Sequence, residues 1–214
     1  MNGPPISNTS SSSVWQAKGA KQIGEEAWKK MEKTNGELFA LTYGALVAQL
    51  LMDQEDGEAV NRELDRIGYN IGIRLIDEYI ARNSFKVCID SQELAESISK
   101  VALKQFLNTT AAVKDWSADG REFTLAFEAD GGGGPGLLGM EWVELPEQAI
   151  GTLQYGAMLP GVIRGALEMI QLQVECAIVY DLLRSGEKKE GTVMELRIKI
   201  VRRLDDAAPP DDED

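Results

Sequence analysis

The chain contains no histidine and only two cysteines among its 214 residues. Without histidine, neither a Ser-His-Asp nor a Cys-His arrangement can be assembled from this chain. Two cysteines in a chain of this length indicate a reducing compartment rather than a disulfide framework. The sequence also lacks a P-loop and a Cys-x-x-Cys pair. No set of residues in the sequence therefore indicates a catalytic centre or a metal site, and we expect a protein that is not an enzyme.

Long apolar runs and positive charge are also scarce. No run reaches eighteen apolar residues, so we expect no segment to span a membrane. The first residues, MNGPPISNTSSSS, lack the apolar centre of a secretory signal, Asn2 stands where N-myristoylation needs glycine, and the terminal DDED is no prenylation box. The formal net charge is -13, which opposes binding to nucleic acid because phosphates would be repelled. We expect a cytoplasmic globular protein.

The length suits one domain with a tail at each end. Residues 1–33 are rich in serine and proline and then in lysine, and we predict a disordered N-terminal arm, although Trp15 and Trp28 could dock. Residues 34–204 form the predicted domain, and residues 205–214 form an acidic C-terminal tail.

Two helices are predicted at the start of the domain. Thr34 and Glu37 have the spacing of a capping box before a helix over 37–52 that is apolar nearly all round. Such a helix is either central to the core or covered by a partner. A second helix over 59–82 carries two glycines that would let another backbone approach closely. One face of this helix is predicted from apolar spacing and comprises Val60, Leu64, Ile67, Ile71 and Leu75.

The later elements mix helix and strand. Asp90 or Ser91 is the expected cap of a third helix that ends near residue 108. Alternation over 122–128 predicts a strand, with an Asp-Gly turn and a short strand before it. MEWVEL predicts a returning strand, AMLPGVIRGALEMIQLQVECAIVYDLLRSG predicts one long helix from Pro160 to Gly186, and TVMELRIKIVRRL predicts a final strand. The order is that of an α+β domain with an antiparallel sheet covered by helices.

The two cysteines differ in their settings. Cys176 lies in the predicted long helix and is interpreted as a small buried filler. Cys88 lies just before the third helix, whose unpaired amides and positive dipole end favour a thiolate. Lys86 could add to this effect. From these residues alone, Cys88 is either a reactive or modified thiol or a structural residue.

Several long segments of the sequence resemble those of a known protein family. ELFALTYGALVAQL, LDRIGYNIGIRLIDEYIAR, WVELP, GVIRGALEMIQLQVE and IVRRLDD are similar to the acylated small core subunits of the TRAPP vesicle-tethering complex, in the same order from about Glu37 to Asp206. The resemblance implies a twisted antiparallel sheet of about four strands covered on one side by four or five helices. The Gly-rich stretch 131–139 is interpreted as a surface extension of that fold.

The resemblance also implies a function. It implies a non-catalytic subunit of a complex that tethers vesicles between the endoplasmic reticulum and the Golgi apparatus and activates a Rab-type GTPase by nucleotide exchange. The chain would be cytoplasmic and peripheral to cis-Golgi and endoplasmic-reticulum membranes. Related small subunits would pair with it through the helices 37–52 and 59–82, which suit a permanent interface.

The resemblance assigns particular residues as well. It implies an S-palmitoyl or similar fatty acyl thioester on Cys88, folded into an apolar tunnel, and no other cofactor. The resemblance implies that Ala102 faces this tunnel, and we hypothesise that Leu75, Ile98 and Met169 contribute to its walls as well. The tail, from Asp205 and Asp206 onward, is expected to reach the bound GTPase, unless it only aids solubility.

Two other functions compete with this interpretation. A domain of the same fold could hold a free small molecule in the tunnel, with no thioester. A cysteine-dependent acyltransferase would need a base that the sequence does not supply.

Overall fold

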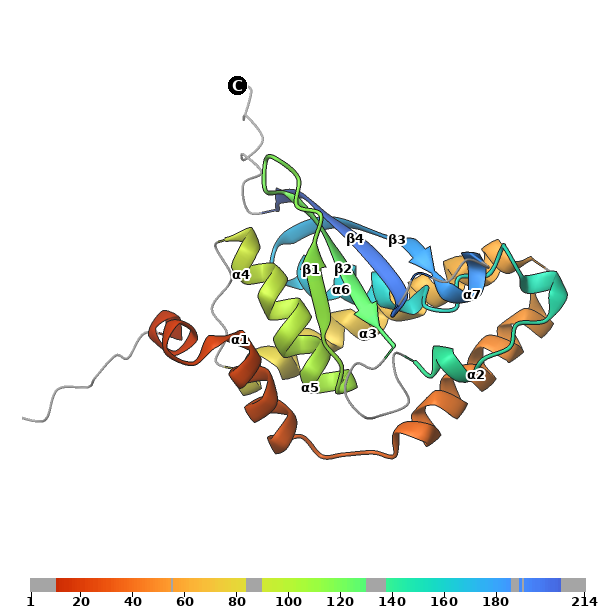
Figure 1. Ribbon diagram of the computed structural model, residues 1–214, viewed down its shortest axis with the longest axis horizontal. Helices are drawn as coiled ribbons and strands as arrows, with labels where there is room; N and C mark the ends of the chain where they lie inside the picture. Colours follow the sequence, from red (N-terminus) through yellow and green to blue (C-terminus); the bar gives the residue numbers. More distant parts are fainter. Residues whose placement is uncertain are drawn as a thin grey trace, which may run out of the picture.

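The computed structural model describes residues 11–54, 56–83, 90–129, 138–185, 189 and 191–204, with side chains from Gly19 onward. Four strands form one antiparallel sheet in the order β1-β2-β4-β3 (Figure 1). The strands are β1 (Ala111–Lys114), β2 (Glu122–Glu128), β3 (Leu172–Asp181) and β4 (Thr192–Arg203). The α+β class and the antiparallel sheet are confirmed.

The sheet has one apolar and one charged face, because side chains alternate along each strand. Phe123 pairs with Ile198, and Leu125 pairs with Leu196, and all four side chains are buried toward the helices. The opposite face carries charged side chains that form ion pairs at the surface, such as Lys199–Glu175 and Arg197–Glu122. The helices therefore pack on the apolar face only.

The helices of the first half begin and end at recognisable signals. Helix α2 (Gly36–Asp53) is capped by Asn35, whose side chain accepts from the Leu38 amide at 2.9 Å. The expected cap, Thr34, is therefore wrong by one residue. Helix α3 runs over Gly57–Asn83. Helix α4 (Ser91–Glu96) is capped by Asp90 as predicted, and continues through a π-helical turn η1 (Ser97–Ala102) into α5 (Leu103–Leu107).

The predicted long helix from Pro160 to Gly186 is wrong. Helix α6 (Met158–Met169) has Pro160 in its first turn, as expected, but Gln171 adopts a left-handed φ of 64° and β3 follows. From Leu172 the pattern changes to period two, with Val174, Cys176 and Ile178 facing inward. Pairing of β3 with β4 stabilises this segment as a strand, and a short helix α7 (Leu182–Ser185) ends it.

The predicted strand over MEWVEL is also wrong. Met140–Trp142 form a 3₁₀ turn (η2), and a second such turn (η3) spans Glu147–Ala149. The segment packs Met140 into the core and leaves Trp142 exposed, so it follows the edge of the fold without joining the sheet. Residues 131–137 of the Gly-rich extension lie outside the described residues.

The disordered arm expected for residues 1–33 is corrected for the part that the structure describes. Helix α1 (Ser11–Lys30) kinks at Gly19 and lies beside the α4–α5 helix (Figure 1). Ala20 and Ala27 are buried in this contact. The arm orders because small side chains let its backbone lie directly on another helix, and a count of large apolar residues misses such a contact.

Two apolar clusters fill the fold. The main cluster lies between the sheet and the helices and includes Leu64, Phe123, Tyr155, Met194 and Ile198. The second cluster is smaller and joins α1, α3, η1, α5 and α6. Its buried members are Ala20, Ile76, Tyr79 and Val101, with Ile23, Ala102, Phe106, Ala166 and Ile170 packed against them.

Candidate functional sites

The cysteine proposed for acylation, Cys88, lies outside the described residues, as do Asp205 and Asp206 of the tail. The structure describes both sides of the Cys88 segment. Helix α3 ends at Asn83 before it, and the Asp90 side chain accepts from the Gln92 amide at 3.2 Å after it.

The four residues proposed to line a tunnel lie in different surroundings. Ile98 is buried in the main cluster, while Ala102 is partly buried and packs on the second cluster. Leu75 is partly exposed on α3, and Met169 at the end of α6 is 49% exposed. The structure therefore buries Ile98, leaves Ala102 and Leu75 partly buried, and leaves Met169 about half exposed.

A buried polar set lies beside the second cluster, where α3 ends. The Asn83 side chain donates to the Tyr79 carbonyl oxygen at 2.9 Å and to Gln105 Oε1 at 2.6 Å. Tyr79 Oη and Ser97 Oγ are 2.6 Å apart and share a hydrogen bond. Gln105 Nε2 and Ser99 Oγ are buried without a hydrogen-bond partner. Because an unpaired buried donor is costly, this set marks the α3–α5 junction as a specialised part of the interior. Sequence reasoning missed it, since none of these residues matches a short motif.

Helix α2 has one buried and one exposed apolar face. Ala40, Tyr43 and Val47 face the core. On the other face, Leu38, Leu41 and Met52 are 60%, 72% and 77% exposed. Together with Ala45 and Ala48, which are also exposed, they form a continuous stripe at three- and four-residue spacing, here named the outer stripe of α2.

The inner face of α2 is fixed by a tyrosine pair. The Tyr43 hydroxyl donates to the Tyr155 carbonyl oxygen, and the two rings meet edge to face with centroids 5.0 Å apart. Burial raises the pKa of Tyr43 well above its ordinary value, and the nearby Tyr155 and Asp181 add to this. Tyr43 therefore stays a neutral hydrogen-bond donor.

The glycine positions of α3 are occupied within the chain. A Cβ atom at Gly68 or Gly72 would overlap the Met158 or Val162 carbonyl oxygen of α6. In return, a Cβ at Gly161 or Gly165 of α6 would overlap backbone atoms of α3. The predicted close approach of a second backbone is thus confirmed, but the partner is α6 of the same chain, so this surface is closed to another subunit.

The outward side of α3 differs from its predicted apolar face. Val60 and Leu64 are buried as expected, but Ile71 is 37% exposed and the buried positions continue through Gly68, Gly72 and Ile76. The predicted apolar face of α3 therefore faces the core only in the first half of the helix.

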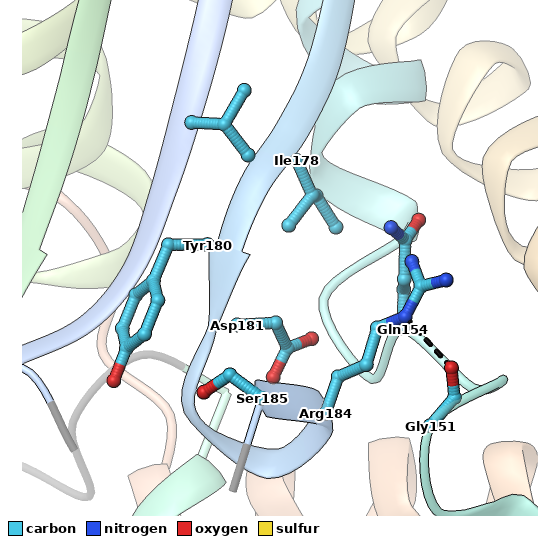
Figure 2. Close-up of a pocket in the computed structure, with 8 residues that line it drawn as sticks. Gly151, Gln154, Ile178, Tyr180, Asp181, Arg184 and Ser185 are labelled. Atoms are coloured by element: carbon cyan, nitrogen blue, oxygen red, sulfur yellow. Dashed lines mark hydrogen bonds between the residues drawn. The ribbon is translucent and has the colours of Figure 1, made fainter. Parts of the chain in front are cut away.

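A pocket of about 340 Å³ lies at the end of β3, and none of the residues assigned to the tunnel lines it (Figure 2). Arg184 crosses it and donates from Nε to the Gly151 carbonyl oxygen at 2.9 Å. Asp181 is buried in its wall and accepts from the Leu183 amide at 2.9 Å, so its position is that of a cap for α7. Burial raises the pKa of Asp181 above its ordinary value, although backbone amides and Arg184 oppose this.

The second cysteine, Cys176, lies in the middle of β3 opposite Ile198 and packs on the main cluster. Burial raises the pKa of its thiol to about 12, with Arg164 opposing the shift. A thiol in this setting stays protonated and inert, which agrees with a structural filler.

Comparison with known proteins gives the family. The sequence model of the transport protein particle (TRAPP) component family matches residues 39–199. The chain belongs to the TRAPP family. Transport protein particle subunit bet3 of Schizosaccharomyces pombe is 43% identical over 192 residues, which cover 90% of this chain and 98% of the relative. Trafficking protein particle complex subunit 3 of Dictyostelium discoideum is 43% identical over 188 residues, which cover 88% and 95%.

A solved structure is also similar to this TRAPP chain. It is a trafficking protein particle complex subunit 3 from Naegleria fowleri covalently bound to palmitic acid, with 40% identity and a TM-score of 0.69. The match covers 81% of this chain and 99% of the other. Within the described ranges, no helix of this chain is long and apolar enough to cross a membrane, and no group of three or more carboxylates or thiols could hold a metal ion.

Proposed function

We propose that this chain is a non-catalytic core subunit of a TRAPP tethering complex in endoplasmic-reticulum-to-Golgi transport, and that it carries a buried fatty acyl thioester on Cys88. The observation that carries the proposal is the similarity to the palmitate-bound subunit of Naegleria fowleri. The sequence contains no histidine that could serve as a base.

The chain's own chemistry supports Cys88 over Cys176. Acyl transfer to sulfur needs a thiolate, and the two cysteines are the only thiols in the sequence. Cys176 is partly buried in a paired strand, and burial raises the pKa of its thiol to about 12. Cys88 precedes the N-terminus of α4, whose dipole favours a thiolate.

The energetic scale of such a lipid supports a structural role. A palmitoyl-sized chain gains about 0.8 kcal/mol per buried CH₂, or on the order of 11 kcal/mol in total. The whole free energy of unfolding of a domain is roughly 5–15 kcal/mol. A buried acyl chain would therefore act as part of the core, and its loss would leave a costly void.

Intact mass spectrometry tests the acylation. Protein purified from a eukaryotic host should be heavier than its sequence by one fatty acyl group, and neutral hydroxylamine should remove that mass. Cys88→Ser should lack the added mass, whereas the matched control Cys176→Ser should retain it. A wild-type protein at its unmodified mass, with no loss on treatment, would contradict the assignment.

The same experiment separates the competing ligand-binding function. A free small molecule in the tunnel would leave on denaturation and appear in the extract, with the protein at its unmodified mass. A thioester stays on the chain until hydroxylamine is added.

Ala102 offers a test of where the acyl chain runs. Ile98 would line its buried part, Ala102 and Leu75 its partly buried part, and Met169 its outer end. Replacing Ala102 with leucine adds three carbon atoms beside the second cluster and should obstruct the acyl chain. Reduced acyl occupancy by intact mass is expected, and unchanged occupancy would move the tunnel away from Ala102.

The outer stripe of α2 supports assembly with related TRAPP small subunits. A stripe of this kind on a folded subunit is typical of a permanent helix interface, since monomers rarely leave such a contiguous apolar surface in water. We therefore assign the pairing surface to α2, with the outward side of α3 around Ile71 as its extension.

In this proposal the assembled complex, and not this chain alone, performs nucleotide exchange on a Rab-type GTPase. The chain would be cytoplasmic and peripheral to cis-Golgi and endoplasmic-reticulum membranes. The tail from Asp205 and Asp206 would contact the GTPase. Removal of residues 205–214 should slow exchange by a reconstituted complex, and an unchanged rate would discard the contact. Co-localisation with a cis-Golgi marker should depend on the other subunits.

A further inference from the structure

Helix α1 is docked through small residues. Ala20, Gly24 and Ala27 are buried at four- and three-residue spacing, while Lys21, Lys29 and Lys30 are exposed. Ile23 adds a partly buried side chain. The buried face of α1 therefore brings its backbone close to a neighbouring helix and contributes little apolar area of its own.

The neighbour is the π-helical turn η1 and the start of α5. A Cβ atom at Gly24 would overlap the Lys100 carbonyl oxygen, so any larger residue at this position must push α1 away. Glu25 and Lys104 form an ion pair at 3.2 Å beside this contact. Short π-helical turns inside helices are frequent at functional sites, and here the turn forms the surface on which α1 lies.

The contact closes the second apolar cluster. Ala20 and Ile23 of α1 pack on the same cluster as Ala102 of η1 and Tyr79 of α3. Ala102 lies twelve residues beyond Asp90, at most about 18 Å along the helix at 1.5 Å per residue. An extended palmitoyl chain is of comparable length. A chain that starts from Cys88 and follows this helix would end beside the second cluster, under α1.

We infer that α1 is an intramolecular cover of the acyl site, and that docking of α1 and occupancy of the site by the acyl chain favour each other. This inference rests on the proposed acylation of Cys88. An acyl chain beneath α1 supplies apolar contact that the small residues of α1 lack. Because coupling is reciprocal, a docked α1 also holds the far end of the acyl chain in its site, so that the chain and its thioester are less often exposed to water and to reagents that cleave the bond.

Hydrogen exchange on the full chain tests the first half of this coupling. Amides of residues 20–30 should exchange more slowly in acylated wild-type protein than in Cys88→Ser, by a factor on the order of ten. Amides of α3 around Gly72, which pack on α6, serve as the internal reference and should differ much less. Intact mass measured on the same samples establishes the acyl group.

Hydroxylamine cleavage tests the second half. Gly24→Leu should displace α1 and release the acyl group faster than wild type, by a factor on the order of five to a hundred. Lys21→Leu adds the same side chain at an exposed position three residues earlier and should behave as wild type. If Gly24→Leu does not fold, removal of residues 1–30 replaces it in the same assay.

The outcomes distinguish the two proposals. With acyl groups verified by mass, equal exchange of residues 20–30 in wild type and Cys88→Ser would overturn the cover and leave the acylation standing. Equal cleavage rates for wild type and the displaced variant would overturn it as well. A wild-type chain without any acyl group would overturn both.

Discussion

Helices α2 and α3 carry similar signals in the sequence and use them in opposite ways. Both suit a close helix interface, α2 through its apolar circumference and α3 through Gly68 and Gly72. In the structure the glycines of α3 pack against α6 of the same chain. Helix α6 also has glycines at this contact, so the two backbones lie close together. The outer stripe of α2 meets nothing within the described residues, with Leu41 72% exposed. An apolar or glycine-bearing helix face therefore predicts that another helix packs against it. It does not predict whether that helix belongs to the same chain or to a partner.

The two helices also differ in how they are held. The α3–α6 pair combines backbone contact with an Arg164–Asp65 ion pair whose two hydrogen bonds measure 2.7 and 3.1 Å. Helix α2 depends on one buried face and on the Tyr43–Tyr155 contact. Substitutions where α3 meets α6 should therefore change the free energy of unfolding of the chain. Substitutions on the outer stripe should instead change its assembly with other subunits.

The largest effect is expected where α3 meets α6. Gly72→Leu should destabilise the chain by on the order of 3 kcal/mol or more, because its Cβ would overlap backbone and the helices must separate. Urea denaturation of the full chain measures this. The control is Gly44→Ala in α2, where a Cβ meets only the Tyr155 hydroxyl oxygen, 3.4 Å away; it should stay within about 1 kcal/mol of wild type. Equal losses for the two variants would contradict the difference between the helices.

A smaller loss is expected at the anchor of α2. Tyr43→Phe leaves the Tyr155 carbonyl oxygen without this donor and should cost roughly 1–3 kcal/mol. Tyr155→Phe is the matched control, because the Tyr155 hydroxyl is buried without a hydrogen-bond partner and its removal should be neutral or stabilising. If Tyr43→Phe were as stable as Tyr155→Phe, the hydrogen bond to the Tyr155 carbonyl oxygen would not anchor α2.

Almost no effect on stability is expected from the outer stripe. Leu41→Ser should change the free energy of unfolding by less than about 0.5 kcal/mol, since the side chain is already exposed. A thermal or urea transition that shifts strongly would show that the stripe is covered within the chain.

The smallest effect concerns pH at the β3 end of the fold, near Tyr43. The raised pKa of Asp181 means that the folded chain binds this proton more tightly than the unfolded chain. Its contribution to stability is therefore present below the ordinary aspartate pKa of 3.8 and is lost as pH rises through the folded value. Asp181→Asn should flatten that part of the stability–pH curve. A wild-type curve with the same slope as that of Asp181→Asn in this range would contradict the raised pKa of this carboxyl group.

The sequence allowed a good part of this fold to be predicted, for local reasons. Alternation placed β2 and β4, and Asp90 was correct as a cap because its side chain bonds an amide two residues away. The glycines of α3 were correctly predicted to allow close packing. These features depend on neighbours within a few residues or on the lack of a Cβ.

The errors concern segments whose structure depends on distant partners. Residues 172–181 are apolar enough for helix or strand, and pairing with β4 decides between them. Helix α1 packs through Ala20, Gly24 and Ala27, which carry no hydrophobic signal, so its contact with η1 was missed. The polar set around Gln105 joins α3 to α5 across 22 positions and has no local pattern.

Affinity purification of the tagged full-length chain, from the cells in which it naturally occurs, tests the central claim most directly. The wild-type chain should recover other TRAPP small subunits. A variant with Leu41→Asp and Met52→Asp in the outer stripe should lose them while keeping its stability, because both side chains are exposed in the isolated chain. Equal recovery of TRAPP subunits by the wild-type and variant chains would contradict the assembly of this chain through α2.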